Sequence, residues 1–216
     1  MNKKNNILSF GFSVILLASV IFAGCGQKEK ILPNSPYSVR GELCSGIFRT
    51  QTQGGWGSKP SGNNPGKYLA NNFAASFPAG VVIGCKDGNS ITLTSAENIK
   101  KLLPQGGTPR PLTTSYNNPV DLDNVLVGQV LALTLNVTFD TNDFGFGSSA
   151  TSLGEQIVVS GMFAGMSVYN VLTEAQNMLG GCGTSAYTAS QINEVVSSIN
   201  ENYVNGDTNK GFLACP

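Results

Sequence analysis

The chain begins with an export signal, which restricts the folded domain to the residues after it. Residues 1–4 carry Lys3 and Lys4, an apolar stretch runs from Ile7 to Phe22, and Ala23-Gly24 follows. A basic start, an apolar centre and a small-residue cleavage site are the three parts of a secretory signal peptide. The sequence therefore predicts a signal peptide over residues 1–24 and a domain that folds outside the cytoplasm.

Cys25 directly follows this cleavage site. The arrangement resembles the lipobox of bacterial lipoproteins, with Phe22 where that motif usually has Leu. The resemblance implies cleavage just before Cys25 and acylation of its thiol by palmitate or a similar fatty acid. Two or more acyl chains, at ~0.8 kcal/mol per buried methylene, would hold the protein stably on a bilayer. The alternatives are an uncleaved membrane anchor and an ordinary signal peptide with an incidental cysteine.

The other four cysteines predict two disulfides, because an even number of cysteines in an oxidising compartment is typical of disulfide pairing. They are Cys44, Cys85, Cys182 and Cys215. None lies in a CxxC pair, which argues against redox or zinc chemistry. Of the three connectivities, we favour Cys44–Cys215, which would tie the domain ends together, and Cys85–Cys182. The second would close a loop of roughly 97 residues, worth ~4–5 kcal/mol in the chain-entropy treatment.

The composition excludes several classes of function. The chain has no histidine, which removes Ser-His-Asp and Cys-His catalysis and His-ligated zinc. The 13 basic and 13 acidic residues balance, and the exported part is slightly acidic because Lys3 and Lys4 belong to the signal. No basic stripe is present, so we expect no nucleic-acid partner. We also expect no cofactor and no metal.

Residues 25–39 are polar and predict a flexible tether between the lipid and the domain. Within them, Gln27-Lys28-Glu29 is similar to the short signals that follow the lipid cysteine in surface-exported lipoproteins of Bacteroidetes. The resemblance implies a surface-exposed protein of the outer membrane. The alternative is a solvated linker without a sorting role.

Residues 40–216 predict one α+β domain, dominated by helices, with a small β portion and long ordered loops. Apolar spacing and capping residues predict helices over 66–77, 94–103, 167–180 and 188–206. Short β-branched runs predict a strand over 42–52 and a hairpin of 81–83 and 91–93 around the turn 86–89. Residues 53–65, 105–118 and 139–153 predict loops.

The segment after Asp121 fits two patterns. Its apolar residues lie on one helical face, but those from Leu131 to Phe139 also alternate as in a strand. We predict a helix that Asp121 caps and that ends near Asn136.

No acidic residues stand out as a catalytic pair. Two facing carboxylates could run glycoside hydrolysis, and the internal acids are Asp87, Glu97, Asp121, Asp123, Glu155 and Glu174. Nothing marks two of these as neighbours. A further set, Asp140, Asn142 and Asp143 before Gly145, is typical of the start of a calcium loop. Phe144 and Thr151 stand where an EF-hand needs oxygen ligands, so the alternatives are an irregular calcium site and, as we favour, an Asx-rich turn.

Trp56 is the single tryptophan and stands among glycines. An exposed indole could stack on a sugar ring, which makes Trp56 a candidate ligand-binding residue. The alternative, which we favour, is that Trp56 packs over the domain while the glycines let the backbone turn tightly.

The segment Thr50–Gly57 (TQTQGGWG) resembles the opening of a domain that recurs in exported and cell-surface proteins of Bacteroidetes and other bacteria. The similarity continues in Leu126–Val137 and Ser198–Tyr203 and covers roughly Cys44 to Gly206. That family has no assigned activity, so the resemblance implies an exported surface domain and no active site.

We therefore predict a lipid-anchored cell-envelope protein with a non-catalytic structural or interaction module, whose partner is a glycan or a surface protein. The first alternative is a carbohydrate-binding surface protein, suggested by Trp56 and the Asn-, Gly- and Thr-rich loops. The second is a carboxylate-based glycoside hydrolase.

Overall fold

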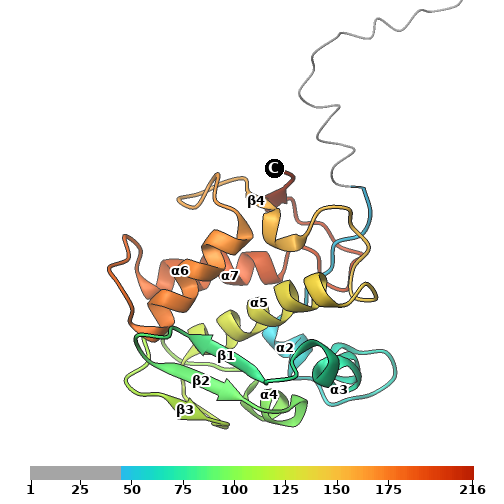
Figure 1. The fold of residues 1–216 in the computed structure, drawn as a ribbon. Coiled ribbons are helices and arrows are strands. Elements are labelled where there is room, and N and C mark those ends of the chain that lie inside the picture. The colour runs from blue at the N-terminus through green and yellow to red at the C-terminus, as the bar shows by residue number, and fades with distance from the viewer. Residues whose placement is uncertain (1–44) are drawn as a thin grey trace, which may run out of the picture. The chain divides into compact units, whose positions relative to one another are not determined.

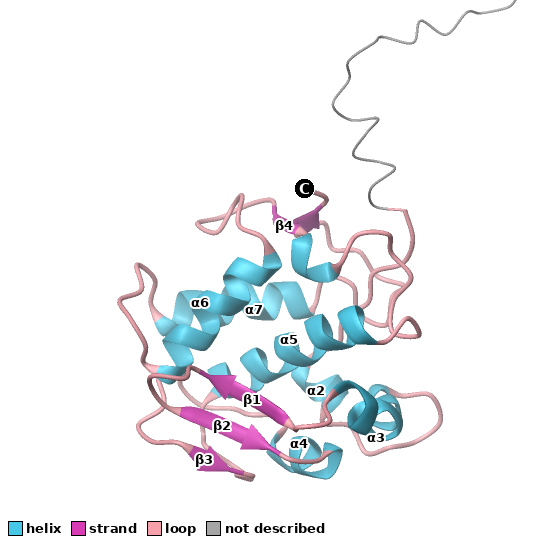
Figure 2. Cartoon of the chain, viewed as in Figure 1, coloured by secondary structure: helices cyan, strands magenta, loops and turns pink. Residues whose placement is uncertain are grey.

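The computed structural model describes residues 45–216, and the statements below concern that part of the chain. Six α-helices, one 3-10 helix and short strands make up these residues, which confirms the predicted helix-dominated α+β domain (Figures 1 and 2). The signal peptide, Cys25, the tether and Cys44 lie outside the described residues. No helix within 45–216 has the length and apolarity needed to cross a membrane.

Helix α5 (Val125–Asn142) forms the centre of the domain. It contacts α6 (Val168–Gly180), α7 (Ala189–Asn200), α2 (Gln53–Trp56) and α3 (Pro65–Ser76) (Figure 1). Twelve of its side chains or glycines are buried. A helix that is covered on all sides needs apolar residues at almost every position, which is why its sequence also alternates like a strand.

Both predicted ends of this helix were wrong. Asn124, not Asp121, is the N-cap: its side chain accepts a hydrogen bond from the backbone N–H of Leu126 at 3.2 Å. The helix continues past Asn136 to Asn142. The extra turn places Phe139, which is fully buried, in the core.

A three-stranded sheet lies against this helical layer in the order β1-β2-β3 (Figure 2). β1 (Val81–Gly84) and β2 (Ser90–Leu93) form the predicted hairpin, and β3 (Tyr116–Asn117) pairs with β2 in parallel. Alternate side chains of the hairpin point into the core, as expected for a sheet with one buried face. A separate small sheet pairs β4 (Ile157–Val158) with β5 (Leu213–Ala214).

The predicted helix starts at Ser167 and Thr188 are confirmed. Each side chain caps its helix, and Thr188 forms a capping box with Gln191. At α4 (Ala96–Leu102) the cap is Ser95, one residue later than the predicted Thr94. Ser95 accepts a hydrogen bond from the N–H of Asn98 at 3.2 Å.

The predicted strand over 42–52 and loop over 53–65 were partly wrong. Within 45–52, the strand-like contact is a single parallel bridge between Thr50 and Val204. The short helix α2 and the first residue of α3, Pro65, lie inside the predicted loop. Similarly, α7 ends at Asn200 rather than near Gly206.

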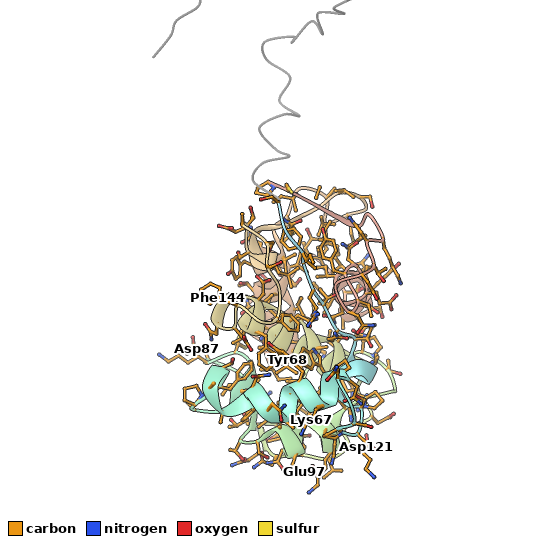
Figure 3. The ribbon with its side chains drawn as sticks, turned by 90° about the vertical axis from the view of Figure 1, so that its right-hand side faces the viewer. Lys67, Tyr68, Asp87, Glu97, Asp121 and Phe144 are labelled. Carbon is orange, nitrogen blue, oxygen red and sulfur yellow. A yellow bond between two sulfur atoms is a disulfide. The ribbon has the colours of Figure 1, made fainter. Side chains whose placement is uncertain are left out.

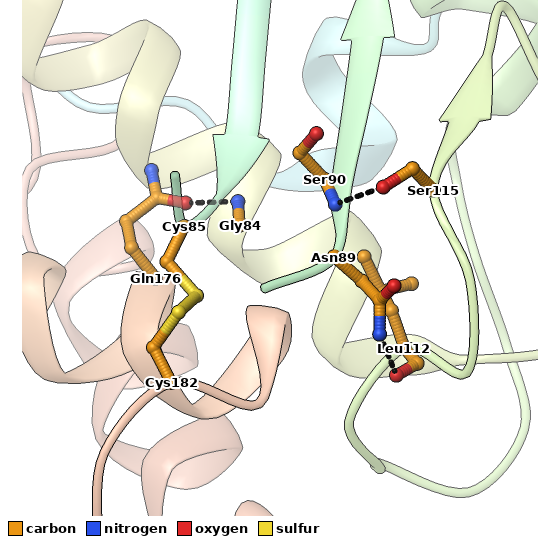
Figure 4. Close-up of a disulfide and its surroundings, with 8 residues drawn as sticks. All are labelled: Gly84, Cys85, Asn89, Ser90, Leu112, Ser115, Gln176 and Cys182. Carbon is orange, nitrogen blue, oxygen red and sulfur yellow. Dashed lines mark hydrogen bonds between the residues drawn. A yellow bond between two sulfur atoms is a disulfide. The ribbon is translucent and has the colours of Figure 1, made fainter. Parts of the chain in front are cut away.

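Cys85 and Cys182 form a disulfide that joins the β1–β2 turn to the end of α6 (Figure 4). The Gln176 side chain accepts a hydrogen bond from the N–H of Gly84 at 2.6 Å beside it. It is the one disulfide whose two cysteines both lie within the described residues. The second predicted pair includes Cys44, which lies outside the described residues, so Cys44–Cys215 stays a prediction.

Candidate functional site

A groove of about 480 Å³ is the best candidate for a functional site. Its lining comes from four separate parts of the chain: the residues before and in α2, the start of α3, the loop after α5, and the loop after α7. The lining residues are Arg49, Gln51, Trp56, Asn63, Asn64, Pro65, Tyr68, Phe146, Asn205 and Asp207. The TQTQGGWG segment thus lies at the groove.

Packed aromatic rings form the floor of the groove. Trp56 is fully buried and stacks on Phe139 and Phe146, with ring centroids 5.3 and 5.7 Å apart. Tyr68 adds a tilted contact to Phe146 at 5.5 Å. Trp56 therefore packs within the domain and lacks the exposed ring face that stacking on a sugar would require. A role of Trp56 in ligand binding stays a prediction, and its place is at the floor of the groove.

Asn136, on α5, holds the TQTQGGWG segment from below. Its side-chain oxygen accepts hydrogen bonds from the N–H of Gln51 at 2.8 Å and from Trp56 Nε1 at 3.1 Å. Its amide nitrogen donates to Gln51 O and to Asn200 Oδ1, both at 2.9 Å. Asn200 in turn donates to Gln129. The three segments that carry the family resemblance are thus joined by one buried polar network.

Arg49 and Tyr68 line the groove with polar groups. The Arg49 guanidinium lies 5.9 Å from the Phe146 ring centroid, and its Nε donates to Asn205 O at 3.2 Å. Arg49 forms no ion pair with any other described residue. The Tyr68 hydroxyl donates to Asp143 Oδ2. Burial, and then the hydrogen bond and charge of Asp143, raise the pKa of Tyr68 well above its ordinary value, so its hydroxyl stays neutral.

Gln51 is the buried polar side chain of the lining. It is 6% exposed, and its backbone binds Asn136 as described above. Its side-chain amide has no hydrogen-bond partner among residues 45–216. Gly55 leaves room for this amide, because an added Cβ there would lie 3.3 Å from Gln51 Oε1.

The acids considered for glycoside hydrolysis are not brought together. Asp87, Glu97 and Asp121 lie at separate places on the edge of the molecule (Figure 3). Glu97 pairs with Lys100 at 2.5 Å, and the hydrogen bond from Lys100, followed by its charge, lowers the pKa of Glu97. Glu155 completes a capping box at the start of the 3-10 helix η1 (Leu153–Glu155). Five hollows in the described part of the chain each have at most one carboxylate in their lining.

The oxygen-rich segment at the end of α5, Asp140–Asp143, accepts hydrogen bonds from backbone and side-chain donors. Asp140 accepts a hydrogen bond from the N–H of Leu153 at 2.6 Å, and Asp143 accepts from Gly145 N at 2.8 Å. Burial raises the pKa of Asp140, and the hydrogen bond from Leu153 partly opposes this effect. No group of three metal-ligating side chains occurs within residues 45–216. The favoured Asx turn is confirmed at Asp143 alone, because Asp140 and Asn142 belong to α5.

Sequence reasoning missed Arg49, Tyr68, Phe146 and Asp207 as groove residues. Of these four, only Arg49 could have been noticed in the sequence, because it is the one charged residue between Glu42 and Lys59. Phe144, which the sequence analysis considered only as a departure from the EF-hand pattern, is 99% exposed at the turn after α5 (Figure 3). Comparisons with family models, curated proteins and solved structures found no match to this chain. The resemblance of the TQTQGGWG segment therefore stays a prediction.

Proposed function

We propose that this protein is a lipid-anchored component of the bacterial outer membrane and that its domain is a non-catalytic interaction module exposed at the cell surface. The export signal and Cys25 support the anchor, because the cysteine stands directly after the small-residue cleavage site. Gln27-Lys28-Glu29 supports the surface location, since a sorting receptor could recognise it next to the lipid.

The chemistry of the groove supports the second part of the proposal, that the domain is a non-catalytic interaction module. Its charged lining residues are one guanidinium and one carboxylate, Arg49 and Asp207. Its phenol, Tyr68, is held neutral by burial and by Asp143. General acid–base catalysis needs a positioned group that exchanges a proton near the working pH. This set offers donors and acceptors for binding a ligand but no such pair, which favours a binding module over a glycoside hydrolase.

Protease treatment of intact cells tests the surface location. We expect added protease to degrade the wild-type protein and to leave the Lys28→Ala/Glu29→Ala variant protected. The two side chains have opposite charges, so the double change keeps the local net charge and isolates recognition of the side chains. Full protection of the wild type would place the protein in the periplasm. Equal degradation of the variant would dismiss the sorting role of these residues.

A further inference from the structure

We propose that the groove beside Trp56 is a binding site for a short, uncharged saccharide, with Gln51, Arg49 and Asp207 as the residues that bind its hydroxyl groups. The inference deepens the proposed function, because it names the ligand class of the interaction module. Its volume of about 480 Å³ lies within the ~300–1,000 Å³ of typical small-ligand pockets.

Gln51 is the first observation that points to a ligand. A side-chain amide has two donor hydrogens and an acceptor oxygen, all of which can bind a ligand. Gln51 is 6% exposed and its amide has no partner among the described residues. Its amide atoms are not among the fully covered unpaired atoms of the described residues, so they reach the groove and are open to water or a ligand there. A hydroxyl group both donates and accepts, so it can bind the Gln51 amide as a water molecule would.

Arg49 and Asp207 determine the charge of the ligand. Their opposite charges leave the groove lining without net charge, because no other lining residue is ionised at neutral pH. An anionic ligand would be attracted by Arg49 but repelled by Asp207. A cationic ligand would be attracted by Asp207 but repelled by Arg49. Both groups are planar and can each bridge two neighbouring polar atoms. Adjacent hydroxyl groups on a sugar ring offer such pairs without charge.

The remaining lining supplies the apolar part of the site. Pro65 and Tyr68 are partly exposed at the start of α3, above the buried ring of Phe146. A sugar ring has polar hydroxyl edges and apolar C–H faces. An apolar wall beside a few fixed polar groups is the usual composition of a small-ligand site. The groove thus matches both kinds of surface of a saccharide.

The fluorescence of Trp56 provides the test, because it is the single tryptophan of the chain and lies at the groove floor. We would titrate the full-length protein in detergent with glucose, mannose, galactose, N-acetylglucosamine, cellobiose and maltose. Concentrations up to about 50 mM saturate a site with a Kd near ~1 mM. Glucuronic acid and a blocked trialanine peptide serve as the charged and non-sugar probes. We expect a saturable change with at least one neutral saccharide and none with the last two.

Two variants locate the site. Gln51→Leu keeps the backbone bonds to Asn136 but removes the amide, and Asp207→Ala removes an exposed carboxylate. We expect each to weaken saccharide binding at least tenfold. The thermal midpoint of Gln51→Leu should stay the same or rise, since its amide has no partner within the described residues. The matched controls are Asp87→Ala, another exposed acid, and Phe144→Ala, another aromatic residue, and both should bind as the wild type does.

The outcomes separate this inference from the proposed function. No saturable change with any neutral saccharide, a preference for glucuronic acid or the peptide, or unchanged affinity in both groove variants would each overturn it. Loss of binding in Phe144→Ala but not in Gln51→Leu would also overturn it. None of these results affects the protease test of surface exposure, which needs no ligand.

Discussion

A single side chain, Asn136, connects the motif segment to the core. Its amide makes four hydrogen bonds, two to the backbone of Gln51, one to the Trp56 indole and one to Asn200, and the residue is fully buried. Buried donors and acceptors that lose their partners carry their full desolvation penalty. Asn136 therefore helps to fix the position of the groove floor, together with the rings stacked on Trp56.

We predict that Asn136→Ala lowers the free energy of unfolding by about 4 kcal/mol, because it leaves several buried polar groups without partners and opens a cavity. Urea unfolding followed by Trp56 fluorescence measures the change. Asn63→Ala is the matched control: its side chain is exposed and makes no hydrogen bond with other described residues, so we expect less than ~0.5 kcal/mol. A similar, small effect of both substitutions would contradict the role of the network.

Asp140 should make stability depend on pH. Burial raises its pKa in the folded state, so the folded protein binds that proton more tightly than the unfolded chain. The resulting stabilisation is complete below the unfolded pKa of about 4 and is lost as pH rises through the raised pKa. Asp140→Asn keeps an acceptor for Leu153 N and cannot ionise. Relative to the wild type, the variant should therefore gain stability as the pH rises from about 4 through the raised pKa of Asp140. A constant difference in unfolding free energy would refute this.

At the scale of elements, local signals were predictable and pairing partners were not. Ser167 and Thr188 were identified as caps because a cap bonds to a residue three positions away. Thr50 pairs with Val204, more than 150 positions along the chain, in an isolated bridge. Because the pairing partner is so distant, the local sequence could not show that residues 45–52 form only this one bridge and no strand. The ends of α5 were missed because a helix buried on all sides has no polar face to mark them.

Close packing of α3 against the loop after α2 requires a glycine at position 66. A Cβ there would lie 1.9 Å from the carbonyl oxygen of Ser58. We predict that Gly66→Ala destabilises the protein by about 2 kcal/mol, because one backbone must move away from the other. Thermal unfolding checks this. Gly106→Ala is the control: nothing lies within 4 Å of its Cβ position, so stability should stay the same or rise slightly. Equal effects of the two changes would contradict the packing argument.

At the scale of the whole molecule, the candidate site was the least predictable feature. Gln51 and Trp56 came from a recognisable segment, but Tyr68, Phe146 and Asp207 come from three other parts of the chain. Only the packing of α3, α5 and the loop after α7 brings them together. The Cys85–Cys182 disulfide, by contrast, was predicted, since the number of cysteines leaves few pairings.

The disulfide should stabilise the molecule by limiting the unfolded chain. Its cysteines are 97 positions apart, and closing such a long loop is worth about 4–5 kcal/mol in the chain-entropy treatment. We predict that Cys85→Ala/Cys182→Ala lowers the free energy of unfolding in urea by that amount, and with it the urea midpoint, while the circular dichroism spectrum stays native. An unchanged midpoint would mean that packing alone holds the β1–β2 hairpin to α6.

Mass spectrometry of the mature N-terminal peptide tests the proposed lipid anchor most directly. The membrane fraction would be extracted with detergent, digested with trypsin and compared with that of Cys25→Ser. We predict that the wild-type peptide begins at Cys25 and carries fatty acyl groups, and that the variant retains residues before position 25 and carries none. A wild-type N-terminus without acyl groups, or one that begins at any other residue, would contradict lipid anchoring through Cys25.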